Sequence, residues 1–488
     1  MIFNSVTYIL FLALAVLLYW VLPRNAGRMM LFLGSLVFYG FWRFEFIPLL
    51  ILAAVIDYWC SIRIEETHNK TRKNYLIFSL CVNLGILFYF KYLTFFAGNV
   101  IWALDFFGCR IAVPHLDIIL PLGISFYTFE TISYTVDVYR GHIKAERNFL
   151  NYATFLVYFP HLIAGPVLRA SEILPQLNTK KTFRHEYLVE GIKRIIQGLF
   201  LKVVLADNIS PFVDLGFSIP TAELSAIDVT TLAFMFGFQI YFDFSAYSHI
   251  AIGSAKMMGI EFPENFNYPY AAASFKDFWK RWHISLSSWI RDYLYLPLMK
   301  AKVRGDGSTG IGSALSDEGP PRRNKHVALF ITWAIMGLWH GANWTFIFWG
   351  VYHAGFVFIE RIVDKFRKRE ELRRGFTRLL NWMIVLPIAM LGWIPFRASN
   401  MHTVWAMYSK FFSFHQYKYL GMKENIYLIC ALLVLFASLS FLYKRYLSEK
   451  VKQLTALSVL LNICAYTFMI ILVFTFLRPI SQFIYFQF

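Results

Sequence analysis

The amino-acid sequence predicts an all-α, polytopic membrane protein. Hydrophobic residues make up 58% of its 488 positions and charged residues only 16%, whereas about a quarter of the residues in an average soluble domain are charged. Apolar stretches long enough to enter or cross a bilayer recur along the whole chain. Lysine and arginine gather in the segments between them. These observations predict a single integral membrane domain, residues 1–488, with roughly ten to twelve membrane helices.

The apolar stretches are the expected membrane segments. The first, residues 2–22, lacks a basic amino-terminal region and a small-residue cleavage site, so we expect a retained helix and not a signal peptide. Its amino terminus should lie outside. The remaining stretches are residues 29–42, 46–60, 75–97, 117–139, 149–167, 189–206, 229–252, 327–360, 380–396, 426–443 and 456–477.

The positive charge follows the topology of the chain. A net charge of +17 is compatible with nucleic-acid binding, but blocks of basic residues between apolar segments are typical of cytoplasmic loops, so we expect no nucleic-acid partner. These blocks are residues 61–74, 140–148, 169–203, 276–304, 322–325, 361–378 and 444–452. The segment 207–228 contains no lysine or arginine and should face the opposite side.

Two apolar segments are better interpreted as re-entrant than as spanning. Residues 149–167 have basic segments on both sides and contain two prolines, and residues 278–298 form an amphipathic stretch that includes Pro297. Irregular backbone at membrane depth is tolerated only where protein or water surrounds it. We therefore expect a central cavity walled by the other helices. Residues 301–323, rich in glycine, serine and proline, predict a flexible cytoplasmic loop.

Several motifs are missing from the sequence. It contains no Gly-x-Ser-x-Gly elbow, P-loop, dinucleotide-binding fingerprint or His-Glu-x-x-His motif. The five cysteines have no metal-type spacing. We therefore expect no bound metal, no disulfide framework and no serine-nucleophile or ATP-driven mechanism.

His340 is the strongest single pointer to function. It lies in the apolar, aromatic stretch 333–349, where an ionisable group at bilayer depth is costly and usually functional. A neutral imidazole can take a proton from a hydroxyl near neutral pH. The alternative is a core histidine that donates to a helix carbonyl. Trp339 and Asn343 could orient this imidazole or close the cavity, although Trp339 could equally be plain packing.

His283 lies in a different setting, in which basic and indole side chains interleave. Its neighbours include Trp279 and Trp282. This pattern predicts an interfacial histidine that lines the cytoplasmic side of the cavity. The alternative is membership of an aromatic belt at the membrane surface.

The basic side chains around His283 are candidates for binding the phosphates of a nucleotide-containing donor, with anionic lipid headgroups as the alternative ligand. Asp243 and Tyr241 lie together in a further apolar segment and are candidate cavity residues; the buried acid needs a partner and could instead be structural. The basic candidates are Lys276, Lys280, Arg281 and Arg291.

Five motifs in a fixed order give the chain a family resemblance. The motifs are Pro121-Leu-Gly-Ile-Ser-Phe-Tyr-Thr-Phe129 with Asp137-Val-Tyr-Arg-Gly141, Phe159-Pro-His-Leu-Ile-Ala-Gly-Pro166, Gln239-Ile-Tyr-Phe-Asp-Phe-Ser245, Phe278-Trp-Lys-Arg-Trp-His-Ile-Ser-Leu286 with Arg291-Asp-Tyr-Leu-Tyr295, and Gly337-Leu-Trp-His-Gly-Ala342. With these motifs the chain resembles the membrane-bound O-acyltransferases, most closely the bacterial branch that O-acetylates exported polysaccharides such as alginate.

The resemblance implies a ring of membrane helices around a thinned centre, in the bacterial inner membrane. His340 matches the family's essential histidine and His283 its supporting one. Acetyl-CoA would be the cytoplasmic donor substrate, with no permanently bound cofactor. The acceptor would be an exported polysaccharide or a secreted or membrane-anchored acetyltransferase. Two features depart from the family's pattern: His249 stands where relatives usually carry an aspartate, and the 301–323 loop is unusually long.

Two alternatives remain open. Within the same class, the chain could acylate a cell-wall polymer, as in D-alanylation of teichoic acid from a carrier-protein thioester or O-acetylation of peptidoglycan. From another class, it could be a proton-coupled transporter whose intramembrane histidines relay protons.

Overall fold

The computed structural model describes residues 1–109, 117–179, 181–299, 324–366, 375–453, 455–478 and 483–484, and in this part of the chain it contains helices and loops but no strands. The helices form two compact units. Unit 1 comprises Met1–Ile195 and His249–Pro263, and unit 2 comprises Ile196–Ser248 and Glu264–Phe488. The predicted loop 301–323 lies outside the described residues.

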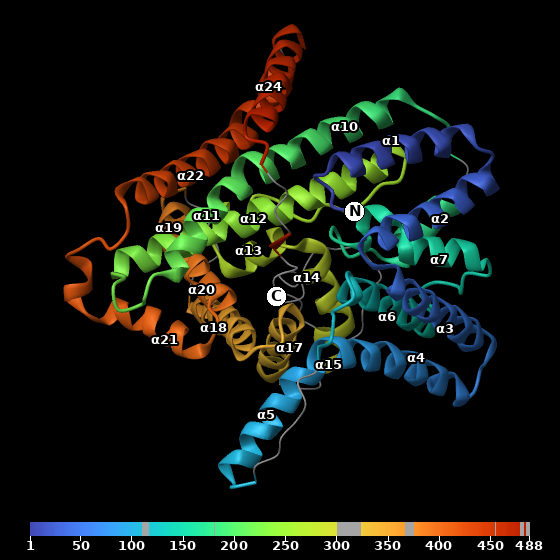
Figure 1. Cartoon of the computed structure of the whole chain (residues 1–488), viewed down its shortest axis with the longest axis horizontal. Helices are drawn as coiled ribbons and strands as arrows, with labels where there is room; N and C mark the ends of the chain where they lie inside the picture. Colours follow the sequence, from blue (N-terminus) through green and yellow to red (C-terminus); the bar gives the residue numbers. More distant parts are fainter. Residues whose placement is uncertain are drawn as a thin grey trace. The chain divides into compact units, whose positions relative to one another are not determined.

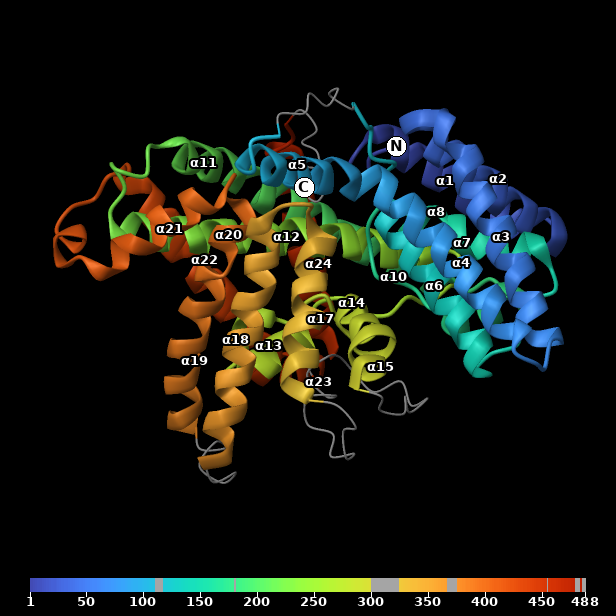
Figure 2. The ribbon, with the colours of Figure 1, turned by 90° about the horizontal axis from the view of Figure 1, so that it is seen from below.

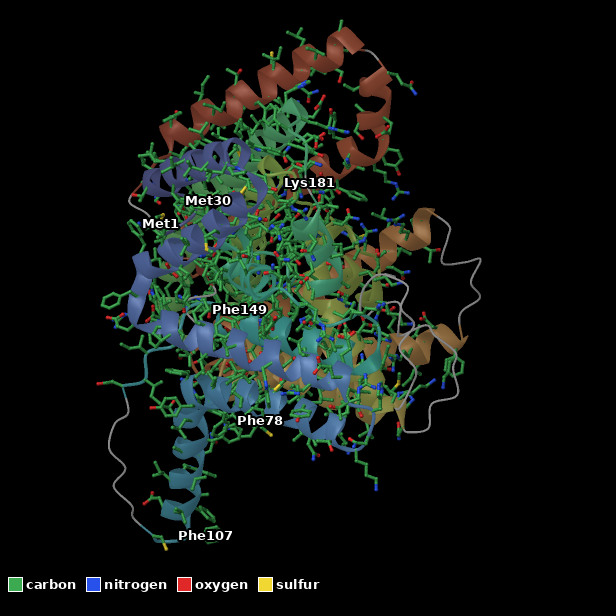
Figure 3. All side chains as sticks on the ribbon, turned by 90° about the vertical axis from the view of Figure 1, so that its right-hand side faces the viewer. Met1, Met30, Phe78, Phe107, Phe149 and Lys181 are labelled. Carbon is green, nitrogen blue, oxygen red and sulfur yellow. The ribbon has the colours of Figure 1, made fainter. Side chains whose placement is uncertain are left out.

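Unit 1 contains the amino-terminal helices, of which α3, α4 and α6 contact one another (Figure 1). Apolar side chains on the outer surface, such as Phe78 on α4 and Phe107 at the end of α5, are 49% and 77% exposed (Figure 3). Such a surface suits contact with lipid. The helices are α1 (Val6–Val21), α2 (Arg24–Arg43), α3 (Ile47–Glu66), α4 (Thr71–Leu87), α5 (Leu93–Phe106), α6 (Ile124–Arg140), α7 (Phe149–Val157), α8 (Phe159–Leu162), α9 (Ala170–Asn178) and α10 (His185–Leu199).

Unit 2 contains the two expected catalytic histidines. The helix α12 (Ala226–Met257) contributes its residues up to Ser248 to this unit. The other helices are α11 (Asp207–Ser218), α13 (Phe275–Arg281), α14 (Ile284–Ile290), α15 (Leu296–Met299), α17 (Lys325–His340), α18 (Trp344–Phe366), α19 (Gly375–Leu391), α20 (Trp393–Arg397), α21 (Met401–Ser409), α22 (Glu424–Leu442), α23 (Ser448–Gln453) and α24 (Thr455–Thr475). Wider π-helical turns occur at Phe200–Ala206 and Arg291–Tyr295.

Six helical segments among the described residues are long and apolar enough to cross a membrane: Arg24–Glu66, Thr71–Phe106, Trp344–Phe366, Phe376–Arg397, Glu424–Leu447 and Ala456–Thr475. The chain is therefore a multi-pass membrane protein, and the count of ten to twelve passes stays a prediction. The two segments expected to be re-entrant are broken into short helices, α7 and α8 in one and α13, α14 and α15 in the other. Irregular backbone was predicted there; re-entry itself stays a prediction.

The apolar stretch 327–360 is not one helix but a hairpin of α17 and α18, which lie side by side (Figure 2). The two helices pack tightly because two glycines let their backbones approach closely. A Cβ added at Gly337 would lie 2.1 Å from the Phe346 carbonyl oxygen, and one at Gly350 would lie 2.1 Å from the Trp333 carbonyl oxygen. Small residues allow membrane helices to pack this closely. The hairpin places His340 at the end of α17, beside α18.

Candidate functional site

His340 is the last residue of α17, with 4% of its surface exposed. Its imidazole is surrounded by aromatic rings from three helices. The ring centroid lies 4.9 Å from that of Trp339, 5.0 Å from that of Trp349 on α18 and 5.4 Å from that of Phe396 on α20. The site therefore presents a buried imidazole with apolar walls, as general-base chemistry in a dry environment requires.

Asn343, which was expected to orient the His340 imidazole, makes its hydrogen bonds to other groups. Its Oδ1 accepts a hydrogen bond from the Thr345 backbone N–H at 3.1 Å, and its Nδ2 donates to the Ser399 carbonyl at 3.4 Å. These contacts cap the start of α18. The structure thus assigns Asn343 to the turn of the hairpin and leaves Trp339 as the sequence neighbour that touches the His340 ring.

His283 is completely buried within the protein, and its expected position at the membrane interface stays a prediction. Its ring meets Phe244 edge to face at 4.5 Å, and neither ring nitrogen has a hydrogen-bond partner among the described residues. Burial lowers the pKa of His283 to about 3, so its imidazole is neutral at physiological pH. Packing against Phe244 thus buries a ring that the sequence pattern placed beside exposed cations.

The backbone at His283 is strained. Its φ of +42° lies in the left-handed region that few non-glycine residues adopt. Asn265 holds the strained turn: its carbonyl accepts from the Ile284 N–H at 2.9 Å, and its Oδ1 accepts from Ser285 Oγ at 2.9 Å. Strain of this kind persists where surrounding contacts enforce it and is frequent at functional sites.

Aromatic rings connect the two histidines. Trp282, next to His283, lies 4.7 Å from Trp393, which lies 6.0 Å from Trp349, the ring that touches His340. Trp279, the other expected cavity residue, lies 5.7 Å from Trp349. We name these rings the tryptophan cluster: Trp279, Trp282, Trp333, Trp349 and Trp393, all fully buried. The expected cavity residues Trp279 and Trp282 thus lie in one cluster with the ring that touches His340. The aromatic-belt alternative for His283 stays open.

Three of the four expected phosphate-binding residues have carboxylate partners. Lys276 Nζ lies 2.5 Å from Asp364 Oδ2 and 3.8 Å from Glu360 Oε1. The same arrangement recurs for the other two: Arg281 Nε lies 2.8 Å from Asp277 Oδ1, and Arg291 Nε lies 2.6 Å from Asp292 Oδ1. Lys280 is half-buried on α13. A phosphate at this surface would have to share these cations with the carboxylates.

Asp243 has the partner that its buried charge demanded. Lys202 Nζ lies 2.7 Å from Asp243 Oδ1 and 2.9 Å from Asp207 Oδ1, and the Ile484 backbone N–H donates to Asp243 Oδ2 at 2.8 Å. This buried ion triad favours the structural interpretation of Asp243. Tyr241 packs at 6.1 Å from Trp282. The sequence analysis did not single out Lys202, although a lysine inside the apolar stretch 189–206 is unusual enough to have indicated it.

Sequence reasoning also missed a buried carboxylate–histidine pair in unit 1. His161 Nε2 lies 3.1 Å from Glu130 Oε2, both side chains are 1% exposed, and Glu130 Oε1 accepts from the Leu168 N–H at 3.1 Å. Both residues fall in or beside motifs that carry the family resemblance, which was the available signal. Among the described residues, no group of three or more histidines, cysteines and acids is placed to hold a metal ion.

A third histidine of unit 2, His353 on α18, was likewise missed. It is completely buried, and its ring lies 5.2 Å from that of Trp349. The apolar setting that singled out His340 also applies to His353, so the signal was present in the sequence.

Comparisons with known proteins show which proteins this chain is similar to. A sequence model of the membrane-bound O-acyltransferase family matches residues 84–311 and 319–397. A probable alginate O-acetylase of Azotobacter vinelandii is 40% identical over 85% of this chain and 78% of the relative. A peptidoglycan O-acetyltransferase of Helicobacter pylori is 34% identical over 83% of this chain and 78% of the relative. A teichoic acid D-alanyltransferase of Bacillus subtilis is 28% identical over 59% of this chain and 71% of the relative.

Proposed function

Because the chain belongs to the membrane-bound O-acyltransferase family and is an O-acyltransferase, we propose that it transfers an acetyl group from cytoplasmic acetyl-CoA across the bacterial inner membrane for O-acetylation of an exported polysaccharide. The observation that carries the proposal is His340, a buried imidazole among aromatic walls at the end of α17. The names of the relatives that are at least 34% identical support an acetyl group and a polysaccharide acceptor.

His340 is the general base of the proposed reaction. It takes the proton from the acceptor hydroxyl as that oxygen attacks the thioester carbonyl. The carbon–sulfur bond then breaks, the thiolate leaves, and the proton passes to the sulfur. The reaction needs no acyl-histidine. His283, neutral because it is buried, positions the donor or stabilises the developing charge through a ring N–H.

The donor is held by the basic segment that precedes and follows His283. Lys280, for which no carboxylate contact is seen among the described residues, is the first candidate for a phosphate. Lys276, Arg281 and Arg291 would exchange their carboxylate partners for a phosphate. The acceptor is the polysaccharide hydroxyl itself or a serine of a secreted or membrane-anchored acetyltransferase.

The same-class alternative differs in its donor. A teichoic acid D-alanyltransferase is among the relatives, at 28% identity. A D-alanyl enzyme would draw on a carrier-protein thioester. The transporter alternative has no support from the family or from its relatives.

Donor specificity separates these possibilities. Purified protein in nanodiscs is incubated with acetyl-CoA, or with a D-alanyl carrier protein, and thioester consumption is followed. The proposal predicts consumption of acetyl-CoA and release of free CoA, with no consumption of the carrier thioester. Consumption of the carrier thioester alone would replace the acetyl donor by the D-alanyl one.

A further inference from the structure

His353 on α18 is a buried histidine to which the proposed reaction gives no task. Its side chain is completely buried. Three indoles of the tryptophan cluster surround it: its ring centroid lies 5.1 Å from that of Trp279, 5.2 Å from that of Trp349 and 6.0 Å from that of Trp333. These rings come from α13, α18 and α17, so His353 packs against α17, which carries His340, and against α13, which ends two residues before His283.

Trp349 links His353 to His340 directly. The indole meets His340 at 5.0 Å with an interplanar angle of 85°, and it meets His353 at 5.2 Å with an angle of 70°. One indole is thus held edge to face by two imidazoles. Because protein interiors are close-packed and transmit strain, a change in the ring at position 353 tilts Trp349 and moves its contact with His340.

The nitrogen atoms of His353 set it apart from an ordinary packing residue. Neither has a hydrogen-bond partner among the described residues, and the same holds for the indole nitrogens of Trp279, Trp333 and Trp349. Burying unpaired polar groups is costly, and an apolar ring would fill the same space without that cost. Bulk alone therefore does not account for an imidazole at this position.

Gly392, at the start of α20, fixes the imidazole from the other side. A Cβ added there would lie 2.8 Å from His353 Nε2 and 3.0 Å from Tyr352 Cε1. The imidazole is therefore held between the backbone at Gly392 and the tryptophan cluster, with no room to shift toward α20.

We propose that His353 is a positioning residue, which holds the Trp349 indole and through it sets the orientation of the His340 imidazole. The inference rests on the proposed role of His340 as general base. His353 itself touches neither substrate nor the transferred proton. Orientation matters because a displacement of about 1 Å in a catalytic group can cost roughly a hundredfold in rate.

The kinetic test uses two variants that disturb His353 in different ways. His353→Asn removes the imidazole ring. Gly392→Ala keeps the ring but displaces it, because the added methyl group would lie 2.8 Å from His353 Nε2. With acetyl-CoA as the probe, both variants should lower kcat for CoA release by roughly tenfold to a hundredfold, with KM changed by less than about twofold. His326→Asn is the matched control: it makes the same exchange on α17, where the ring contacts Phe358 at 4.9 Å, outside the tryptophan cluster. This variant should keep the wild-type kcat.

A second readout does not depend on activity. The rate at which diethyl pyrocarbonate modifies His340, followed by mass spectrometry of its peptide, should differ severalfold between the wild type and both variants, but not for His326→Asn. Wild-type kcat and an unchanged His340 modification rate in both variants would overturn the inference. His340→Ala, measured in parallel, separates the two proposals: full activity of that variant contradicts the general base, whereas its inactivity beside fully active His353 variants contradicts only the positioning role.

Discussion

At the scale of single residues, the candidate site combines two buried imidazoles with aromatic neighbours. His340 is surrounded by aromatic rings, and His283 sits on a strained backbone with no hydrogen-bond partner for its ring nitrogens among the described residues. Burial lowers the pKa of His283, so its imidazole is neutral at physiological pH. A neutral ring suits the supporting role proposed for His283, which needs a hydrogen-bond donor and not a strong base.

The buried state of His283 predicts an acid-sensitive fold. Its pKa of about 3 in the folded protein lies below the 6.5 of an exposed histidine, so the unfolded state binds the proton first as the pH falls. Its contribution to stability is therefore complete above pH 6.5 and is lost as the pH falls towards 3, by at most about 1.4 kcal/mol per pH unit.

His283→Gln should flatten this dependence. Midpoints of thermal unfolding in detergent between pH 7 and pH 4 provide the measurement. A variant with the same pH slope as the wild type would show that other groups cause the acid sensitivity.

The Glu130–His161 pair predicts a loss of stability when it is broken. Glu130→Gln removes the carboxylate from this buried hydrogen-bonded pair and should cost about 1 to 3 kcal/mol. The control is Glu66→Gln, which removes an exposed partner of Arg147; exposed pairs contribute little. The free energy of unfolding of each variant is measured by chemical denaturation. Equal losses in the two variants would contradict a larger stabilising contribution from the buried pair.

At the scale of elements, the α17–α18 hairpin positions His340, and it depends on two glycines. Gly350→Ala inserts a methyl group 2.1 Å from the Trp333 carbonyl oxygen. The backbones must separate, at a cost of roughly 1 to 3 kcal/mol, and CoA release should fall because the His340–Trp349 contact opens.

Gly355→Ala is the matched control on the same helix, because a Cβ there meets nothing within 4 Å. It should be neutral or slightly stabilising, since alanine favours helix by up to about 1 kcal/mol over glycine. The midpoint of thermal unfolding and the rate of CoA release are measured for both variants. Equal midpoints and equal rates would show that the close approach of α17 and α18 at Gly350 does not matter for stability or activity.

The sequence predicted the helical class, the broken backbone at 149–167 and 278–298, and the convergence of the expected histidine segments. It missed the turn at residues 341–343 because the apolar run continues through it without a charge. The expectation of an interfacial His283 rested on the interleaved cations, of which Lys276, Arg281 and Arg291 pair with carboxylates. A lysine inside the apolar stretch 189–206 was a local signal for Lys202, but its pairing with the distant Asp243 had none.

At the scale of the whole molecule, the distribution of basic residues predicts how the chain crosses the membrane. Single cysteines in a variant lacking the five native ones test this with a membrane-impermeant maleimide. Ser218→Cys should react from outside, whereas Lys70→Cys should react only after permeabilisation. Both positions are exposed in the structure, so the control for accessibility is labelling in detergent. Labelling of Lys70→Cys in intact cells would reverse the orientation.

Release of free CoA from acetyl-CoA is the most direct test of whether His340 is the base of an acetyl-CoA-dependent transfer. Wild type, His340→Ala, His283→Ala and the control His326→Ala are compared at equal amounts of folded protein in nanodiscs. The account predicts release by the wild type and the control, loss in His340→Ala of roughly a hundredfold or more, and a reduced rate in His283→Ala. Release by His340→Ala at the wild-type rate would contradict it.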